Sequence, residues 1–350
     1  MKILIISPFE NHATGRGDRN TRLAKELSQR GHTVVTFTCN FDHSRKKHIP
    51  VDKLSSTSDL KVIRVPGYLQ NVSFARILCH FTVAIKLWAW AIRFRWDTVV
   101  VSSIPPEVLL ATIFLKKQSL IVDIRDIWPD ALSSYKSKSI IYKIFNRYCD
   151  LIYKFSLQFA DRILIVAPDF SKWLKRYTSY KSRKVKLIPL GFQREDFKCL
   201  SKGGEDYDFC YAGGATPQFD IQEFAKTLNK EKGIILGDGP LLNKWKESFP
   251  KSKFLGSIPR KQAISIMSSS QKLIFPSNKY AQLPNKAFDY FAMGYPVILG
   301  KNCSKATAYL LSLRNKRASR GIDNWQDYKT IEKEYLTTKT ANIIEESKSK

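Results

Sequence analysis

The sequence predicts an α/β protein with two doubly wound parallel sheets. Short runs rich in Ile and Val alternate with longer amphipathic segments along most of the chain, as expected when helices connect parallel strands. The predicted strands are continuously apolar, which is typical of sheets covered on both faces. The length of 350 residues fits two domains, at ~150 residues for each.

In the first half of the chain, an apolar strand at 2–7 leads into an amphipathic helix at 21–29. Gly31 follows this helix, in a position where glycine commonly ends one. Further strands are expected at 33–39, 61–65, 98–102, 120–124, 162–166 and 186–189. Together these elements predict a first domain over residues 1–197.

A polar segment at 198–208 contains Gly203 and Gly204 and is interpreted as a linker. The alternation then restarts, which predicts a second domain over residues 209–330. Its strands are expected at 209–212, 233–236, 253–255, 272–275 and 296–299. Residues 331–350 are expected to form a C-terminal helix and a frayed tail.

Charge is the unusual feature of the composition. The chain has 58 Lys and Arg against 31 Asp and Glu, a net charge of +27. A positive field of this size favours polyanions: nucleic acid, nucleotide phosphates or an anionic membrane. Hydrophobic residues make up 43% and charged residues 25% of the chain, which excludes a largely disordered protein. The six scattered Cys lack a CxxC pair, which argues against a zinc or redox motif and indicates reduced thiols in a cytosolic protein.

Three stretches, at 74–96, 135–159 and 172–186, combine basic with apolar side chains. The basic residues of the middle stretch include Lys136, Lys138 and Lys143. Basic amphipathic helices of this kind suit an anionic membrane surface. The alternative is that the apolar positions are core and the lysines are only solvated. Charged residues interrupt the longest apolar stretch, so no membrane-spanning helix is expected.

A glycine-containing loop precedes the first helix. Gly15, Gly17 and Arg19 fit part of a dinucleotide-binding pattern, but Asn20 stands where the last glycine belongs. A loop that opens a helix still offers backbone N–H groups and a positive dipole end to an anion. The loop is therefore predicted to bind a phosphate, with a flexible surface loop as the alternative.

The segment 123–130 follows a predicted strand, where ligands bind in open α/β sheets. It holds three carboxylates, an Arg and a Trp, which favours a functional site over a salt-bridged loop.

A second segment, 284–298, is predicted to form a short helix, a glycine turn and a buried strand. Lys286 and Asp289 share one face of this helix, so that a carboxylate could hold a ribose while the ammonium meets a phosphate. The alternative there is a surface ion pair.

Four ordered blocks resemble GT-B glycosyltransferases of the family 4 type, in the branch that builds bacterial surface polysaccharides such as O-antigen and capsule. The blocks are the loop with Gly15, Gly17 and Arg19 before 23–34, then 125–130, then 236–240 with 254–256, and finally 283–298. They span roughly residues 1–300 of the chain, and the last block is the most specific.

The resemblance implies a GT-B fold, in which two Rossmann-like domains face a cleft. The acceptor is expected on the first domain, with Asp126 and Arg125 at its side of the reaction centre. The second domain is expected to bind the nucleotide sugar, with Lys286 near the phosphates and Asp289 at the ribose. The residues expected at the donor are Gly15, Gly17, Arg19, Gly213, Gly214, Leu255, Gly256, Ile258, Lys279, Lys286 and Asp289.

Two positions depart from the family pattern. Ala281 stands where the first of two paired acids is usual, and Asp289 replaces the Glu of the second. The loop at 212–216 also lacks the usual Arg and Lys, so Lys286, Lys279 and Arg19 are the candidates that would supply charge to the phosphates.

The sequence thus predicts a hexosyl- or N-acetylhexosaminyltransferase. A nucleotide sugar, with a UDP-sugar favoured, would donate to a polyprenyl-diphosphate-linked or oligosaccharide acceptor, with retention as the family expectation. No cofactor and no metal are expected, because no DxD motif stands at a strand end. The expected location is the cytoplasm, peripherally on the inner membrane face.

Two alternatives remain open. A GT-B nucleotide-sugar epimerase would interconvert two donors without an acceptor. A basic nucleic-acid-binding protein would use the charge differently, but no helix-turn-helix, RRM or zinc-finger pattern is present, so nucleic acid is not an expected partner.

Overall fold

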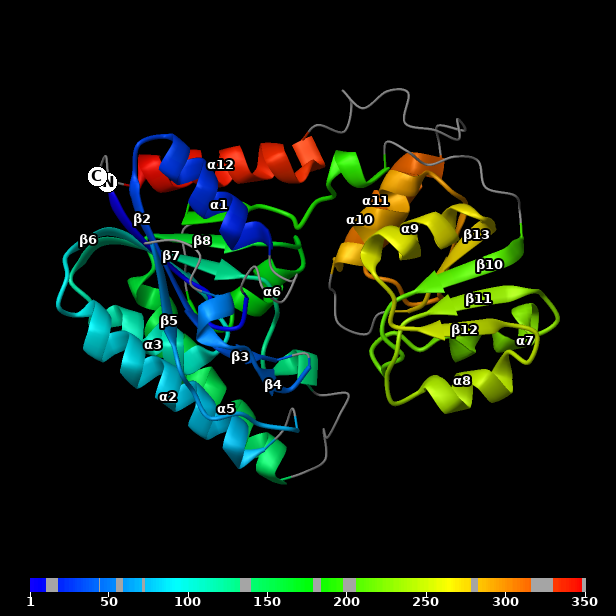
Figure 1. The fold of residues 1–350 in the computed structure, drawn as a ribbon, viewed down its shortest axis with the longest axis horizontal. Helices are drawn as coiled ribbons and strands as arrows, with labels where there is room; N and C mark the ends of the chain where they lie inside the picture. Colours follow the sequence, from blue (N-terminus) through cyan, green and yellow to red (C-terminus); the bar gives the residue numbers. More distant parts are fainter. Residues whose placement is uncertain are drawn as a thin grey trace.

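The computed structural model describes residues 1–10, 18–43, 45–54, 59–70, 73–132, 140–178, 184–197, 206–277, 283–315 and 330–347. These residues form two parallel sheets, each covered by helices on both faces and lying at opposite ends of the molecule (Figure 1). The predicted fold class, two Rossmann-like doubly wound domains, is confirmed.

The first sheet has the order β5-β2-β1-β6-β7-β8-β9 within the described residues. Its strands are β1 (Lys2–Ile6), β2 (Thr33–Cys39), β5 (Leu60–Ile63), β6 (Trp96–Ser102), β7 (Lys117–Ile124), β8 (Arg162–Ile165) and β9 (Val185–Leu187). All neighbours are parallel. The chain order reverses between β1 and β6, and ligands of such sheets bind beyond the carboxyl ends of the strands at this point.

The second sheet repeats this arrangement with the order β12-β11-β10-β13-β14. Its strands are β10 (Tyr207–Ala212), β11 (Gly233–Leu236), β12 (Lys253–Gly256), β13 (Ser270–Phe275) and β14 (Val297–Leu299). Its helices are α7 (Ala225–Leu228), α8 (Leu242–Ser248), α9 (Arg260–Ser268), α10 (Asn285–Met293) and α11 (Lys305–Asn315). The reversal here lies between β10 and β13.

Two groups of helices cover the first sheet. On one side lie α2 (Phe74–Ala91), α3 (Pro106–Ile113) and α5 (Ile140–Ser156), and on the other α1 (Asp18–Gln29) packs beside α12 (Lys333–Glu346) (Figure 1). A short helix, α6 (Phe170–Leu174), follows β8. The C-terminal helix has therefore returned to the first sheet, where Leu336 and Ile344 share a core cluster with Leu23 and Leu27.

Most expected strands are present within two or three residues of their predicted limits. The first helix begins at Asp18 rather than at 21. Gly294, at φ +69°, ends α10 in the left-handed conformation that glycine adopts most easily. The hairpin of β3 (Phe41–Asp42) and β4 (Lys47–His48) was not predicted, because two-residue strands are too short to give a periodic pattern.

One helix of the described residues, α2, is long and apolar enough to cross a membrane by length and composition. In this fold it lies along the sheet. Seven of its residues are buried against the first domain, among them Arg76 and His80. Its outer face is considered below.

Candidate functional site

A cavity of about 320 Å³ lies at the carboxyl ends of β1, β6 and β7, at the reversal point of the first sheet. Ser7 and Glu10 reach it from the end of β1, and Arg125 and Asp126 from the end of β7. Gln218, from the second half of the chain, completes its lining. The cavity therefore lies where the two halves meet.

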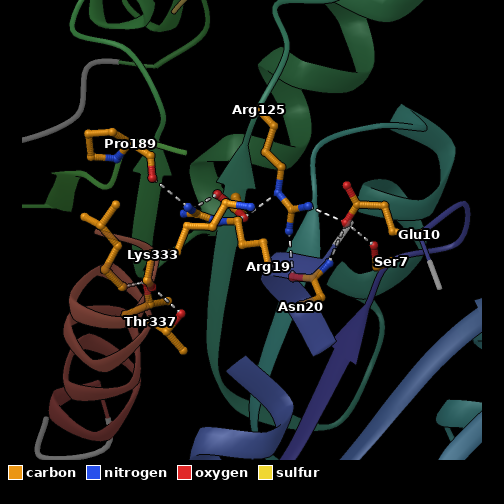
Figure 2. A network of polar contacts seen from close by, with 11 residues as sticks. Ser7, Glu10, Arg19, Asn20, Arg125, Pro189, Lys333 and Thr337 are labelled. Atoms are coloured by element: carbon orange, nitrogen blue, oxygen red, sulfur yellow. Dashed lines mark hydrogen bonds and ion pairs between the residues drawn. The ribbon is translucent and has the colours of Figure 1, made fainter. Parts of the chain in front are cut away.

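A buried polar cluster adjoins this cavity and shares Ser7, Glu10 and Arg125 with its lining. Figure 2 shows the polar contacts of the cluster. Asp123, at the end of β7, accepts hydrogen bonds from Arg19 Nε at 3.0 Å and from Arg125 Nε at 2.7 Å. Arg19 also donates to the carbonyl oxygen of Pro189 at 3.0 Å. The Asp123 side chain is 4% exposed, and each guanidinium is 13% exposed.

The cluster continues from Arg125 to the first helix and to the end of β1. Arg125 Nη2 donates to Asn20 Oδ1 at 2.6 Å, and Arg125 Nη1 forms an ion pair with Glu10. The same Glu10 oxygen, Oε2, accepts from Asn20 Nδ2 at 3.0 Å and from Ser7 Oγ at 2.9 Å. The Glu10 carboxylate is thus fixed through one oxygen (Figure 2).

The charges inside the cluster balance one another. Burial alone would raise the pKa of Asp123, but Arg19 and Arg125 hold it below its usual value. Burial works against the charge of Arg125, yet Glu10 and Asp123 raise its pKa above the ordinary value. The positive charge predicted for the donor phosphates at Arg19 is therefore already paired with Asp123.

Asp126 stands in the same cavity without being part of the buried cluster. Its Oδ1 accepts a hydrogen bond from the backbone N–H of Ile127 at 2.9 Å, which fixes the carboxylate at the turn after β7. Across the cavity, the Arg76 guanidinium lies 4.2 Å from the ring centroid of Trp128. Asp126 is therefore a carboxylate placed at the reversal point, beside aromatic and cationic groups.

A second cavity, of about 590 Å³, lies at the carboxyl ends of β10, β11 and β12. Its lining is mostly backbone and small side chains: Ala212, Gly213, Gly214, Leu236, Gly237, Asp238, Gly239, Ser257, Ile258 and Ala263. Gly237 has φ +125°, and a Cβ there would lie 1.9 Å from the carbonyl oxygen of Gly213. Only glycine permits this close approach of two loops, which leaves backbone groups as the wall of the cavity.

Lys286 approaches the rim of the second cavity from α10. Its Nζ donates to the Tyr211 hydroxyl at 3.0 Å and lies 3.6 Å from the Phe219 ring centroid. A Cβ on Gly213 would lie 3.2 Å from this ammonium, so Lys286 packs directly under the glycine loop. Burial lowers the pKa of Lys286 well below its usual value, and no carboxylate of the described residues is paired with it.

Asp289, one turn further along α10, faces a different partner. Arg260, at the start of α9, donates to both of its carboxylate oxygens at 2.8 Å. The surface ion pair between Lys286 and Asp289, left open above, is absent from the structure. The two side chains reach separate surroundings although they are three residues apart.

The structure brings some of the predicted donor residues together. Gly213, Gly214 and Ile258 line the second cavity, Gly256 adjoins it through a 2.7 Å bond from the Gly237 N–H to its carbonyl oxygen, and Leu255 packs at the edge of the core. Among the described residues, the linings of the two cavities include neither Arg19 nor Asp289. Gly15, Gly17, Lys279 and Ala281 lie outside the described residues, as do Lys136 and Lys138.

The model of the family described as Glycosyltransferase Family 4 matches residues 18–196, half of the chain. The chain belongs to this family. An uncharacterised glycosyltransferase of Methanocaldococcus jannaschii is 25% identical over 219 residues, which are 56% of this chain and 52% of that protein. The chain thus matches about half the length of this curated relative.

Solved structures of glycosyltransferases share the fold over the whole chain. Sucrose-phosphate synthase from Thermosynechococcus elongatus has a TM-score of 0.72 at 14% identity, with 99% of this chain and 98% of that chain covered. The lipopolysaccharide outer core galactosyltransferase WaaB gives 0.59 at 12%, covering 100% and 95%. Anabaena HepE in complex with UDP-glucose gives 0.56 at 12%, covering 100% and 97%. The GT-B fold of a family 4 glycosyltransferase is thereby established.

For this family 4 glycosyltransferase, sequence reasoning missed several residues of the two cavities. Glu10, Arg76 and Gln218 line the first cavity, and Asp238, which the sequence placed within the block 236–240 without a role, lines the second. Glu10 lies four residues beyond the end of β1, so its place in the loop after a strand end was a usable signal. Arg76 is buried on α2 and was interpreted only as one of the charges that interrupt the longest apolar stretch, because a single cation inside an apolar helix carries no mark of which face it occupies.

Proposed function

We propose that this glycosyltransferase binds a nucleotide sugar at the second cavity and transfers the sugar to an acceptor in the first. The observation that carries the proposal is the pairing of two cavities, each at the carboxyl ends of the strands of its own sheet, with Gln218 of the second half entering the first cavity. A UDP-sugar is favoured as donor, and the fold neighbour HepE was solved with UDP-glucose.

The proposed chemistry follows from the charges that develop during glycosyl transfer. The leaving diphosphate gains negative charge, and donors fixed toward it lower the barrier. Lys286 and the backbone N–H group of Gly214 would supply these donors, since the Gly213 N–H already donates to the Leu236 carbonyl oxygen at 2.9 Å. On the acceptor side, Asp126 would accept the proton of the attacking hydroxyl group. We propose that the reaction needs no metal ion and retains the configuration of the sugar.

The finer assignment is part of the same proposal. The transferred sugar would be a hexose or an N-acetylhexosamine. The acceptor would be a lipid-linked or growing surface glycan such as O-antigen or capsule, and the enzyme would act in the cytoplasm on the inner membrane face. The net charge of +27 supports an anionic partner. A membrane is preferred over nucleic acid because the sequence has no helix-turn-helix, RRM or zinc-finger pattern.

The test is a screen of donor hydrolysis with purified protein across UDP-, GDP- and dTDP-sugars. We expect one nucleotide class to be hydrolysed slowly without acceptor, and Lys286→Ala to lower the rate of that hydrolysis. Lys272→Ala is the matched control, because Lys272 pairs with Glu231 at 2.8 Å away from both cavities. Conversion of one nucleotide sugar into another without acceptor would favour the epimerase instead, and no turnover of any donor would contradict the proposal.

A further inference from the structure

The outer face of α2 carries a stripe of exposed apolar side chains. Its members are Phe74, Leu78, Phe81, Ile85 and Trp88. They recur at steps of four and three residues and so lie along one side of the helix. Phe74 is 81% exposed and Ile85 is 62% exposed. The opposite side, with Cys79, Val83 and Leu87, is buried against the first sheet, so the stripe is not part of the core.

A matching stripe runs along α5 and the turn that follows it. Its members are Ile140, Ile144, Leu151, Phe155 and Phe159, all exposed. Tyr148 lies on the same side of α5, and its ring centroid is 6.3 Å from that of Phe81. The two stripes therefore meet at Phe81 and Tyr148 and form one continuous apolar surface, which we call the α2–α5 face. Figure 1 shows these two helices on the same side of the first sheet.

The two helices of this face expose basic side chains and no acidic ones. Helix α2 contains no Asp or Glu, and α5 contains one acid, Asp150, which accepts a hydrogen bond from Tyr177 at 2.6 Å. The exposed charged residues of the two helices are Lys86, Lys143, Arg147 and Lys154. An exposed apolar patch of this length is unusual on a monomer and marks an interaction surface. Its basic border specifies an anionic partner.

We propose that the α2–α5 face docks the enzyme on an anionic lipid bilayer. The apolar stripes would enter the boundary between headgroups and acyl chains, with the lysines and arginine at the level of the phosphates. This inference deepens the proposed function, since it names the surface on which a lipid-linked acceptor would be presented, and for that role it rests on the proposed function.

The position of the face relative to the first cavity supports this occupant. Arg76 lies on the buried side of α2, in the turn between Phe74 and Leu78, and lines the cavity that holds Asp126. One helix thus has the cavity on one side and the exposed stripe on the other. A helix is about 10 Å thick, so a lipid-anchored acceptor would need to cross only that depth to reach Asp126.

The experiment is vesicle co-sedimentation of the full chain, with neutral phosphatidylcholine vesicles and with vesicles that also contain phosphatidylglycerol. Two variants alter the face: Phe74→Ser with Ile85→Ser and Ile144→Ser removes apolar contacts, and Lys143→Glu with Arg147→Glu and Lys154→Glu reverses its charge. Matched controls on other surfaces are Leu187→Ser with Tyr309→Ser, and Lys246→Glu with Lys251→Glu and Lys253→Glu. All the substituted side chains are exposed.

We expect the native chain to bind the anionic vesicles and to bind less as salt rises. The charge variant should lose about 100-fold in partitioning, the apolar variant roughly tenfold or more, and the controls should bind like the native chain. Failure to bind anionic vesicles at low salt would overturn the proposal, and so would equal losses in the controls. Self-association that only the face variants abolish, seen by sedimentation velocity, would assign the face to a second copy.

Donor hydrolysis measured on the same variants separates the two proposals. None of the altered residues lines either cavity, so hydrolysis of the nucleotide sugar should be unchanged in solution. Vesicle binding without donor hydrolysis would leave the docking face in place and contradict the proposed function. Donor hydrolysis without vesicle binding would support the proposed function and contradict the docking face.

Discussion

The Arg260 guanidinium donates a hydrogen bond to each carboxylate oxygen of Asp289, both at 2.8 Å. The same guanidinium reaches Asp196 at 3.1 Å, in the short helical turn η6 (Arg194–Phe197) that leaves the first half of the chain. The residue predicted to hold the donor ribose is thus held by a cation at the start of α9. A carboxylate has about four acceptor sites, so Asp289 can keep Arg260 and still accept from ribose hydroxyls.

We expect Asp289→Ala to raise the donor dissociation constant by roughly tenfold or more, because a hydrogen bond to a charged group contributes ~1.5–3 kcal/mol. Titration calorimetry with the nucleoside diphosphate measures this. Asp196→Asn is the control, since it removes the other carboxylate at Arg260 and leaves Asp289 in place. If Asp289→Ala and Asp196→Asn weaken binding equally, the effect belongs to the position of Arg260 and not to a contact with ribose.

Lys286 is expected to act more on rate than on binding. Its ammonium lies against the Gly213 loop, where the diphosphate of the proposed donor would leave with growing negative charge. Lys286→Ala should therefore lower kcat by a larger factor than it raises KM, measured on donor hydrolysis. A change confined to KM would reduce Lys286 to a binding residue.

The buried ammonium of Lys286 also predicts a pH dependence of stability. Its folded-state pKa is lowered by burial, below the ~10.4 of an unfolded lysine. Between these two values the unfolded chain binds more protons than the folded chain, so the free energy of unfolding rises with pH in that window. The melting temperature of the native chain relative to Lys286→Met should therefore increase as pH rises from neutral toward 10.4. A difference in melting temperature between the native chain and Lys286→Met that stays constant with pH would mean that the ammonium is not desolvated.

The parallel sheets and the ends of their strands were predictable from sequence. Continuous apolar runs indicate strands, and the carboxyl ends of parallel strands lie at one edge of their sheet. Asp126 and the Gly213–Gly214 pair follow predicted strands, so their place at this edge was predictable from the sequence. Gly213 and Gly214 were assigned to the donor from the family resemblance, and the close approach of two loops that requires glycine at Gly237 was not predicted. These inferences rest on short-range signals that the chain carries locally.

The partners of the charged residues were not predictable in the same way. Arg19 pairs with Asp123, which is 104 positions away, and Asp289 pairs with Arg260, 29 positions away. No periodicity connects such residues, because the contact is made by packing of separate elements. A basic residue near a glycine loop was therefore assigned to phosphate, whereas the fold uses Arg19 to balance a buried acid. The same limit hid Arg76, whose side of α2 depends on which face the sheet covers.

Asp126 and Arg125, which the sequence placed together at the reaction centre, are expected to have different roles. Asp126 accepts a hydrogen bond from the Ile127 N–H, and Asn at that position retains an oxygen that can accept it. Asp126→Asn should therefore leave the melting temperature nearly unchanged while removing the base. We expect transfer to an acceptor to fall about 100-fold or more, the range in which a general base contributes.

Arg125 should behave in the opposite way. It is paired with Asp123 and Glu10 and donates to Asn20, so its removal leaves two carboxylates without their cation in a buried cluster. Arg125→Met should cost ~3–5 kcal/mol of unfolding free energy, the usual penalty for breaking a buried ion pair. Thermal unfolding and donor hydrolysis, measured on both variants, together distinguish a structural role from a role in the reaction. A stable but inactive Arg125→Met would indicate that Arg125 takes part directly in the reaction. A nearly native transfer rate in Asp126→Asn would show that Asp126 does not.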